Sequence, residues 1–401
     1  MYSNEYYNRI TTRIQDYLVE HEVPVPRWRD TSAGDGSSSD ELAFRAWILR
    51  AMQELHIQVD ERDRQQVTRE VAKRIIGLGV LQPYLEEEGV EEIIVRGGYV
   101  MVERNGQISN EGYLVDGSDH GDSYFYRMAR RIAEMEGIGL GAKDPRIKVG
   151  LPDGSRFAAT IPPISRQGTA INIRRFARKK LSLEDLVSYG SADHETIDFL
   201  AEVASSMKVS VVFAGRPGAG KTTWLNAFSA HLPSQAQVTV VETFEELQPQ
   251  VEHYHHLVVS DEGNEMADAI NTSVLRMRPD VVMIGEVVSR EAYQYIMALN
   301  LGIVSHTTTH AQSAMMALAR LENLARRDMD VEELRPVIGY GLGLVVHLSK
   351  DFDPEQRRYV RRMNEMIALQ GYEDGQYKVK LLKRWDGSGF TPLAGGMELF
   401  R

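Results

Sequence analysis

The sequence has no cysteine among its 401 residues. This absence excludes disulfide bonds and metal sites built on thiolates. No apolar run approaches the ~18 consecutive residues that a membrane-spanning helix needs. The first residues, Met1 to Tyr6, also lack the charged and then apolar order of a signal peptide. From these absences we expect a protein that stays in the cytoplasm.

Positive charge is in deficit as well. Lys and Arg number 46 against 57 Asp and Glu, which gives a formal net charge of −11. Because such a protein repels phosphate backbones, we expect no general nucleic-acid-binding surface, although local basic patches remain open. Hydrophobic residues make up 43% of the chain. This is an ordinary globular composition, and the length suits two or three domains.

One glycine-rich segment predicts the class of ligand. It follows the apolar run Val209 to Ala214 and reads Gly215, Arg216, Pro217, Gly218, Ala219, Gly220, Lys221, Thr222, Thr223. A strand, this loop and a helix in that order direct backbone N–H groups and a helix N-terminus at one point, where they bind a polyphosphate. Lys221 supplies a charge for the β- and γ-phosphates, and the Thr222 hydroxyl completes a Mg²⁺ shell. The alternative is a turn that matches by chance.

Acidic residues follow two further apolar segments. Val281 to Ile284 lead through a glycine to Glu286, which we expect at a strand end, holding Mg²⁺ through water and orienting the attacking water. Val238 to Val241 lead to Glu242 and Glu246. The alternative for each is an acid that solvates a loop.

Two histidine patterns have different interpretations. His310 ends the segment Thr307 to Thr309 and is either a γ-phosphate sensor or a structural hydrogen-bonding residue. The group His253 to His256 has no carboxylate at ligand spacing, so we interpret it as a polar loop.

The pattern of apolar residues predicts the domain organisation. Residues 1–21 carry an apolar stripe at helical spacing and predict an amphipathic helix, whose docking partner stays open. Residues 22–40 are rich in Pro, Gly and Ser and predict a flexible linker. Residues 41–176 predict a smaller α+β domain with leading helices, 177–182 a hinge, and 183–401 an α/β domain. In this last part helices alternate with buried strands, which is typical of a doubly wound, mostly parallel sheet of the RecA-like P-loop type.

Several motifs together resemble a known superfamily. The P-loop, the acidic box Val241 to Leu247, the segment Leu275 to Glu286 and Thr309 to Ala311 resemble the secretion ATPases of type II and type IV secretion. The resemblance is strongest to the Tad/Flp pilus assembly ATPases, the CpaF/TadA group. It extends over about residues 60–395 and includes motifs of the first domain at 77–83, 90–97, 151–156 and 171–176.

The resemblance implies a homohexameric ATPase ring without a transmembrane segment. Such a ring is peripheral at the cytoplasmic face of the inner membrane, held there by a platform protein of the pilus or secretion system. ATP hydrolysis with Mg²⁺ would power pilus assembly, with retraction left open. The implied roles are phosphate and Mg²⁺ binding for Lys221 and Thr222, Walker B glutamate for Glu286, acidic box for Glu242 and Glu246, and second histidine of the histidine box for His310. Arg156, Arg174 and Arg175 would reach the nucleotide from the first domain.

Three positions depart from the pattern of the family. Thr243 replaces an Asp of the acidic box, Val288 replaces an Arg after the Walker B glutamate, and Ile303 replaces the first His of the histidine box. These departures leave two alternatives to a motor: a nucleotide-gated assembly scaffold with weak hydrolysis, and a conjugation-type secretion or DNA-transfer ATPase. Direction of work and cargo stay open.

Overall fold

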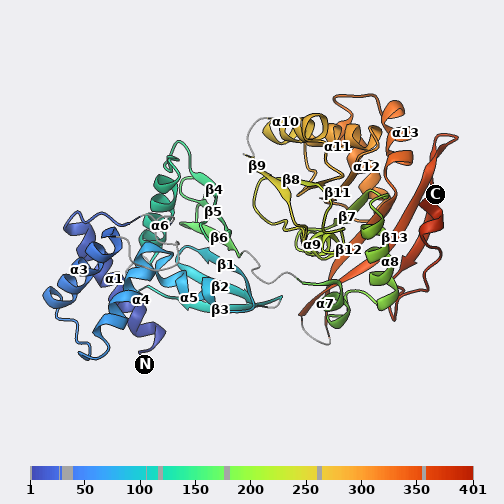
Figure 1. Cartoon of the computed structure of the whole chain (residues 1–401). Helices are drawn as coiled ribbons and strands as arrows, with labels where there is room; N and C mark the ends of the chain where they lie inside the picture. Colours follow the sequence, from blue (N-terminus) through green and yellow to red (C-terminus); the bar gives the residue numbers. More distant parts are fainter. Residues whose placement is uncertain are drawn as a thin grey trace. The chain divides into compact units, whose positions relative to one another are not determined.

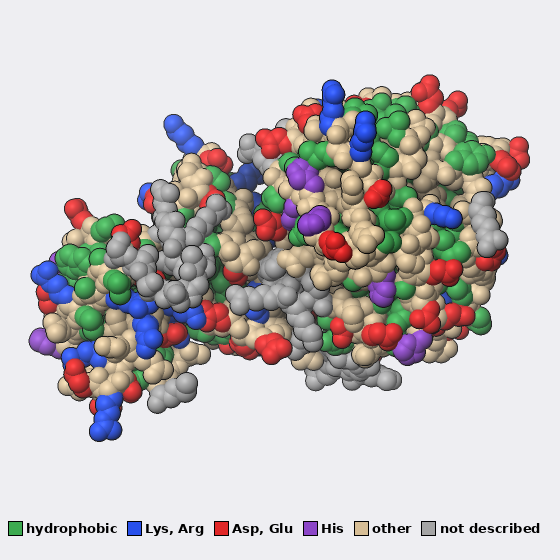
Figure 2. Space-filling model, viewed as in Figure 1, with side chains coloured by type: hydrophobic (Ala, Val, Ile, Leu, Met, Phe, Trp, Pro, Cys, Tyr) green, Lys and Arg blue, Asp and Glu red, His purple; other side chains and the backbone are tan. Residues whose placement is uncertain are grey.

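The computed structural model divides the chain into two compact units, residues 1–177 and 178–401 (Figure 1). It describes residues 2–26, 28, 39–104, 106–115, 121–175, 181–259, 264–354 and 358–400. Most of the predicted linker 22–40 and of the predicted hinge 177–182 lies outside these residues. Among the helices that the structure describes, none is long and apolar enough to cross a membrane. Figure 2 shows acidic side chains spread over the visible surface of both units.

The first unit begins with three helices that share a small core. They are α1 (Asn4–Glu20), α3 (Ser39–Glu54) and α4 (Arg64–Ile76). The predicted stripe of α1 buries Ile10, Ile14 and Leu18 against apolar side chains of α3 and α4. The N-terminal helix, whose docking the sequence left open, therefore packs on its own unit.

Arg74 joins α4 to α1 inside this core, where only 2% of the residue is exposed. Its guanidinium donates to Glu70 at 2.9 Å and to the side-chain oxygens of Asn8 and Asn4 at 2.8 and 2.9 Å. It also lies over the ring of Tyr7, 4.8 Å from the ring centre. A buried guanidinium needs partners for all its N–H groups, and α1 supplies most of them.

A six-stranded antiparallel sheet forms the rest of this unit. Its order is β3-β2-β1-β6-β5-β4. The strands are β1 (Val90–Arg96), β2 (Tyr99–Arg104), β3 (Gln107–Tyr113), β4 (Arg146–Gly150), β5 (Arg156–Thr160) and β6 (Ala170–Arg174). Alternate residues such as Ile93, Phe157 and Ile171 pack against α6 (Asp122–Met135) and against the segment that holds η1 (Gly79–Leu81) and α5 (Gln82–Glu86). The α+β fold that the change of period predicts is confirmed.

The second unit contains an eight-stranded, mostly parallel sheet in the order β14-β13-β12-β7-β11-β10-β8-β9. The parallel strands are β7 (Val211–Gly215), β8 (Val238–Glu242), β9 (Tyr254–Val258), β10 (Val281–Ile284), β11 (Val304–Thr309) and β12 (Leu344–Asp353). β13 (Arg358–Glu373) and β14 (Gln376–Arg384) add an antiparallel edge. The doubly wound α/β sheet is confirmed, whereas the sequence did not predict the antiparallel edge.

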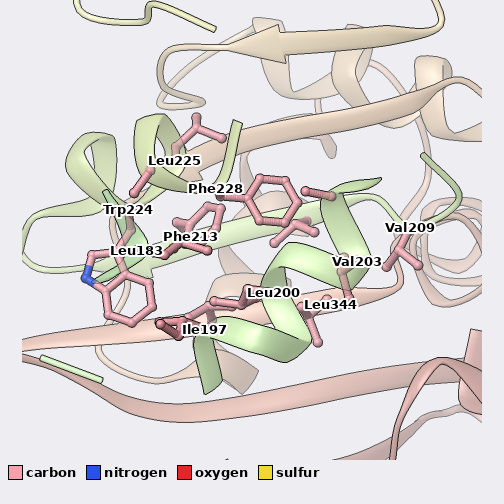
Figure 3. Close-up of a cluster of buried hydrophobic side chains, with 14 of the residues drawn as sticks. Leu183, Ile197, Leu200, Val203, Val209, Phe213, Trp224, Leu225, Phe228 and Leu344 are labelled. Carbon is pink, nitrogen blue, oxygen red and sulfur yellow. The ribbon is translucent and has the colours of Figure 1, made fainter. Parts of the chain in front are cut away.

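Helices cover both faces of this sheet. One face carries α7 (Leu183–Ser188), α8 (His194–Ser206) and α9 (Lys221–Ser229), and its core includes Leu200, Phe213, Trp224 and Phe228 (Figure 3). The other face carries α10 (Glu265–Thr272), the π-helix η2 (Ser273–Met277), α11 (Glu291–Asn300), α12 (Ala314–Ala325) and α13 (Val331–Gly341). A short 3-10 turn, η3 (Met397–Phe400), ends the described chain. Neighbouring residues of one strand enter opposite cores, as the fully apolar strands require.

The predicted polar loop His253 to His256 is wrong. Tyr254 to Val258 form the edge strand β9, paired in parallel with β8 from Val238 to Glu242. An edge strand is less covered by the rest of the protein than a central strand, so it can carry polar side chains. The hydrophobic pattern of the sequence therefore did not reveal β9.

His306 is an unusual residue in the interior of the second unit. Only 1% of it is exposed, neither ring nitrogen has a hydrogen-bond partner, and its ring packs edge-on against Phe228 with centres 4.9 Å apart. Burial lowers the pKa of His306 from 6.5 to about 3. The folded protein therefore holds this imidazole neutral.

We expect Arg74→Ala to destabilise the first unit by about 2 kcal/mol, because the change removes a buried side chain together with its packing and its hydrogen bonds to Glu70, Asn8 and Asn4. Thermal unfolding followed by circular dichroism measures this, and Arg69→Ala, at an exposed position of the same helix, is the matched control. Equal melting of the two variants would contradict the role given to Arg74.

We expect the second unit to become less stable in mild acid, because His306 binds a proton more readily in the unfolded chain. The unfolded chain binds a proton near pH 6.5 and the folded chain only near pH 3, so stability is complete above pH 6.5 and falls by up to about 1.4 kcal/mol per unit below it. Urea unfolding at pH 7.5 and 5.5 should show this loss for the wild type and a smaller one for His306→Leu. His231→Leu, at an exposed position, should behave as the wild type does. An equal loss in all three proteins would exclude His306 as the cause.

Candidate functional site

The glycine-rich loop joins β7 to α9, so strand, loop and helix follow in the predicted order. A Cβ on Gly215 would lie 2.5 Å from the carbonyl oxygen of Leu348, which leaves no room for a side chain. Gly218 and Gly220 have φ of 74° and 91°, in the left-handed region that favours glycine. Gly220 is the N-cap residue of α9. Each glycine of the motif therefore has a backbone reason to be there.

Three predicted site residues meet at the carboxyl edge of the sheet. Lys221 Nζ lies 3.1 Å from His310 Nδ1 and 3.7 Å from Glu286 Oε1, and His310 Nε2 lies 3.0 Å from the same carboxylate oxygen. They come from the ends of β7, β11 and β10, which are neighbours in the sheet and parallel. Lys221 is 8% exposed and Glu286 is 38% exposed, so water partly screens the interaction between the two charges.

A row of threonines on β11 holds the segment around Glu286. The hydroxyls of Thr307, Thr308 and Thr309 donate to the carbonyls of Ile284, Gly285 and Val287 at 3.0, 2.8 and 2.8 Å. The Val287 N–H donates back to the Thr308 carbonyl at 2.8 Å. This role of the threonines was not predicted from the sequence. The available signal was three consecutive hydroxyls in a buried strand, where each needs a partner.

Glu242 is buried at the end of β8, with 3% of the residue exposed. Its Oε1 accepts from the backbone N–H groups of Glu246 and Leu247 at 3.0 and 3.1 Å and lies 2.7 Å from His256 Nε2. Burial raises the pKa of Glu242, and these hydrogen bonds act in the opposite direction. Glu242 thus holds the backbone of the acidic-box loop, and its contact with a cofactor stays a prediction. Glu246 is half-buried in that loop.

Asn226 connects the P-loop helix to the acidic-box loop. Its side-chain amide donates to the carbonyl of Glu246 at 2.7 Å, and its side-chain oxygen accepts from the N–H of Gln248 at 2.8 Å. The residue is 6% exposed. The sequence analysis missed it, although a polar amide on the buried face of α9 is a signal, because such a group needs partners.

The three predicted arginines belong to the other compact unit. Arg156 and Arg174 lie directly opposite one another on β5 and β6. Arg175 donates to the carbonyls of Glu87 and Val90 in its own unit. Their contact with a nucleotide stays a prediction.

The three departures from the family pattern lie in different places. Thr243 follows β8 and is half-buried, and Val288 is 38% exposed after Glu286. Arg290, the nearest arginine after Val288, donates to the side chain of Asn264 at 3.0 Å. Ile303 precedes β11, whereas His310 follows it. Since a strand rises about 3.3 Å per residue, these two positions are roughly 20 Å apart. The Ile303 departure therefore removes no group from the edge of the sheet that carries Lys221.

Comparisons with known proteins identify a family and a fold. A family model described as "Type II/IV secretion system protein" matches residues 114–372. An uncharacterized protein of Methanocaldococcus jannaschii is 30% identical over 242 residues, or 57% of this chain, and the match spans only 33% of that protein. Conjugal transfer protein TrbB of Rhizobium radiobacter is 31% identical over 231 residues, 57% of this chain and 68% of that one.

The X-ray structure of the Yersinia pseudotuberculosis ATPase DotB has a similar fold. The match has a TM-score of 0.52 at 16% sequence identity and covers 76% of this chain and 80% of that chain. At this identity the likeness concerns the fold alone.

We expect Asn226→Ala to loosen the acidic-box loop, because it removes both hydrogen bonds and leaves a buried carbonyl unpaired, at a cost of about 1–3 kcal/mol. Hydrogen exchange measured by mass spectrometry should become faster in peptides covering 244–250. Asn300→Ala, at an exposed position of α11, is the matched control. Unchanged exchange in Asn226→Ala would show that the loop is held by Glu242 alone.

Proposed function

The chain belongs to the type II/IV secretion system protein family, and we propose that it is an ATPase that powers a secretion or pilus machine. The meeting of Lys221, Glu286 and His310 at the end of a P-loop strand carries this proposal. An ammonium, a carboxylate and an imidazole near one helix N-terminus suit a nucleoside triphosphate better than a neutral ligand. The match to TrbB, a conjugal transfer protein, supports work in macromolecular transfer.

The residues at the P-loop fit ATP together with Mg²⁺. Thr222 follows Lys221 in the first turn of α9, and the Glu286 carboxylate lies 3.7 Å from the Lys221 ammonium. The chain thus offers a hydroxyl and a carboxylate near the lysine, and Mg²⁺ prefers oxygen donors of this kind. Among the described residues no group of three or more His, Asp or Glu could hold a metal ion. A metal here would therefore take most of its ligands from phosphates and water. When bound, Mg²⁺ neutralises charge on the phosphates.

In the proposed reaction, water attacks the γ-phosphate in line with the leaving ADP. The loop N–H groups and Lys221 bind the phosphates and stabilise the negative charge of the transition state. Glu286 orients the water and accepts its proton, and Glu246 assists from the acidic-box loop. His310 donates a hydrogen bond to a γ-phosphate oxygen and senses the loss of that group.

The finer part of the proposal rests on the motif resemblance. We propose a homohexamer of the Tad/Flp pilus type, at the cytoplasmic face of the inner membrane and bound to a platform protein there. Arg156 and Arg174 would add charge at the phosphates from the first unit. Hydrolysis would release this clamp and rotate one unit against the other about residues 177–182.

Two other functions each have one observation in their favour. The TrbB relative favours a conjugation-type transfer ATPase. The departures at Thr243 and Val288 favour a nucleotide-gated scaffold with weak hydrolysis. Retention of Lys221, Thr222, Glu246 and Glu286 favours the motor over the scaffold.

We expect Glu286→Gln to lower ATP turnover by about 100-fold or more while ATP binding persists, because the change removes the base but keeps the shape of the side chain. Lys221→Ala should lose ATP binding as well. Turnover against protein concentration, measured together with mass by light scattering, tests both the site and the ring. Glu333→Gln, at an exposed position of α13, is the control.

Full turnover in Glu286→Gln would show that the assignment of this residue is wrong. Tight ATP binding with negligible wild-type turnover in an assembled ring would favour the scaffold instead.

A further inference from the structure

Two cations, Lys350 of β12 and Arg361 of β13, lie against the P-loop. β12 pairs with β7 up to Leu348 opposite Gly215, and the next residues of β12 extend beyond the end of β7. In this extension Lys350 lies directly opposite Arg361 of β13. Both side chains are half-buried.

Arg361 fixes one peptide of the loop. Its Nε donates to the carbonyl of Gly218 at 2.8 Å, and the N–H of Ala219 donates to the carbonyl of Arg216 at 3.1 Å. Both sides of the peptide between Gly218 and Ala219 are therefore hydrogen-bonded. Since Gly218 has φ of 74° and glycine is the most flexible residue, this peptide would otherwise sample several orientations.

Arg361 is itself held in place. The hydroxyl of Ser191, in the segment between α7 and α8, donates to the carbonyl of Arg361 at 2.7 Å. The N–H of Met363 donates to the carbonyl of Ser191 at 2.9 Å. The strand that carries the guanidinium is thus attached to the body of the unit, and the P-loop is braced against a fixed element.

Lys350 adds a second positive charge at the same place. A Cβ on Gly218 would lie 3.3 Å from Lys350 Nζ, and the ammonium lies over the ring of Tyr359, 4.7 Å from its centre. Lys350 and Arg361 thus both lie at Gly218 of the P-loop, the segment where a polyphosphate is expected to bind.

We propose that Lys350 and Arg361 form a second cationic side of the nucleotide site. Lys350 contacts the phosphate chain, and Arg361 is a positioning residue that sets the conformation of the P-loop at Gly218. This inference rests on the proposed function, because it takes the nucleotide at the P-loop as given. It extends the site to a strand pair that the P-loop motif does not include.

The test measures nucleotide affinity of the full chain with Mg²⁺, using ATP, ADP and AMP in isothermal titration. We expect Lys350→Gln to weaken ATP and ADP binding by about tenfold, the effect of one charge-assisted hydrogen bond, and AMP binding by less. In measurements of ATP turnover, Arg361→Gln should raise KM and lower kcat together. Arg361→Lys should restore both values only in part, because lysine supplies the charge without the Nε donor. Arg362→Gln, the neighbouring cation of β13 that stacks on Trp385, is the matched control.

Thermal unfolding without nucleotide separates this role from a structural one. We expect all four variants to melt within a few degrees of the wild type before nucleotide is added, and Lys350→Gln and Arg361→Gln to gain less from added ADP. Wild-type affinity in Lys350→Gln, or full recovery in Arg361→Lys, would overturn the role of that residue. A drop in melting that accounts for the lost binding would overturn both roles. No nucleotide binding by the wild type would instead overturn the proposed function itself, and this inference with it.

Discussion

The parallel pairing of β7, β11 and β10 is the constraint on which the candidate site depends. Thr309 lies opposite Ala214, and Thr307 opposite Ile284, so all three strands end at one edge within a residue or two. His310 follows β11 directly, Glu286 follows β10 after one glycine, and Lys221 follows β7 after the P-loop. The strand pairing thereby brings three residues distant in sequence within hydrogen-bonding or ion-pairing distance. A slip of one residue in either pairing would reverse which core each side chain enters. The two apolar cores therefore fix the register, and the register fixes the site.

Buried polar groups then connect the loops to this frame. The threonine hydroxyls of β11 hold the backbone on both sides of Glu286, Glu242 holds the acidic-box loop, and Asn226 joins that loop to α9. Breaking one of these hydrogen bonds in a low-dielectric interior costs free energy, because no water molecule is available to bond the donor or acceptor that is left. Movement of the P-loop helix is thereby linked to the acidic-box loop through Asn226. Such a link suits a site whose state is communicated to other parts of the molecule.

Local sequence patterns predicted the elements well and the long-range pairs poorly. Each of the P-loop glycines, the buried strands β8 and β10 and the helix α1 carries a signal within a few residues, and all of them form. Strand β9 and the hairpin β12 to β13 could not be predicted in the same way. Lys350 and Arg361 look like solvated charges in the sequence, and only the pairing of β12 with β7 places them at Gly218. Asn226 was missed for a related reason, since its partners Glu246 and Gln248 lie on another loop.

The position of each departure from the family pattern bears on whether the chain hydrolyses ATP or only holds it. Ile303 lies at the opposite end of β11 from His310, so the substitution there changes the turn into the strand and no group at the phosphates. Val288 is partly exposed beyond Glu286, while Thr308 and Thr309 hold the carbonyls of Gly285 and Val287, the residues on either side of Glu286. Only Thr243 sits in the acidic-box loop itself, and the buried partner of that loop, Glu242, keeps its bonds. The groups proposed to bind phosphate and to orient water thus keep their supports, which favours the motor over the scaffold.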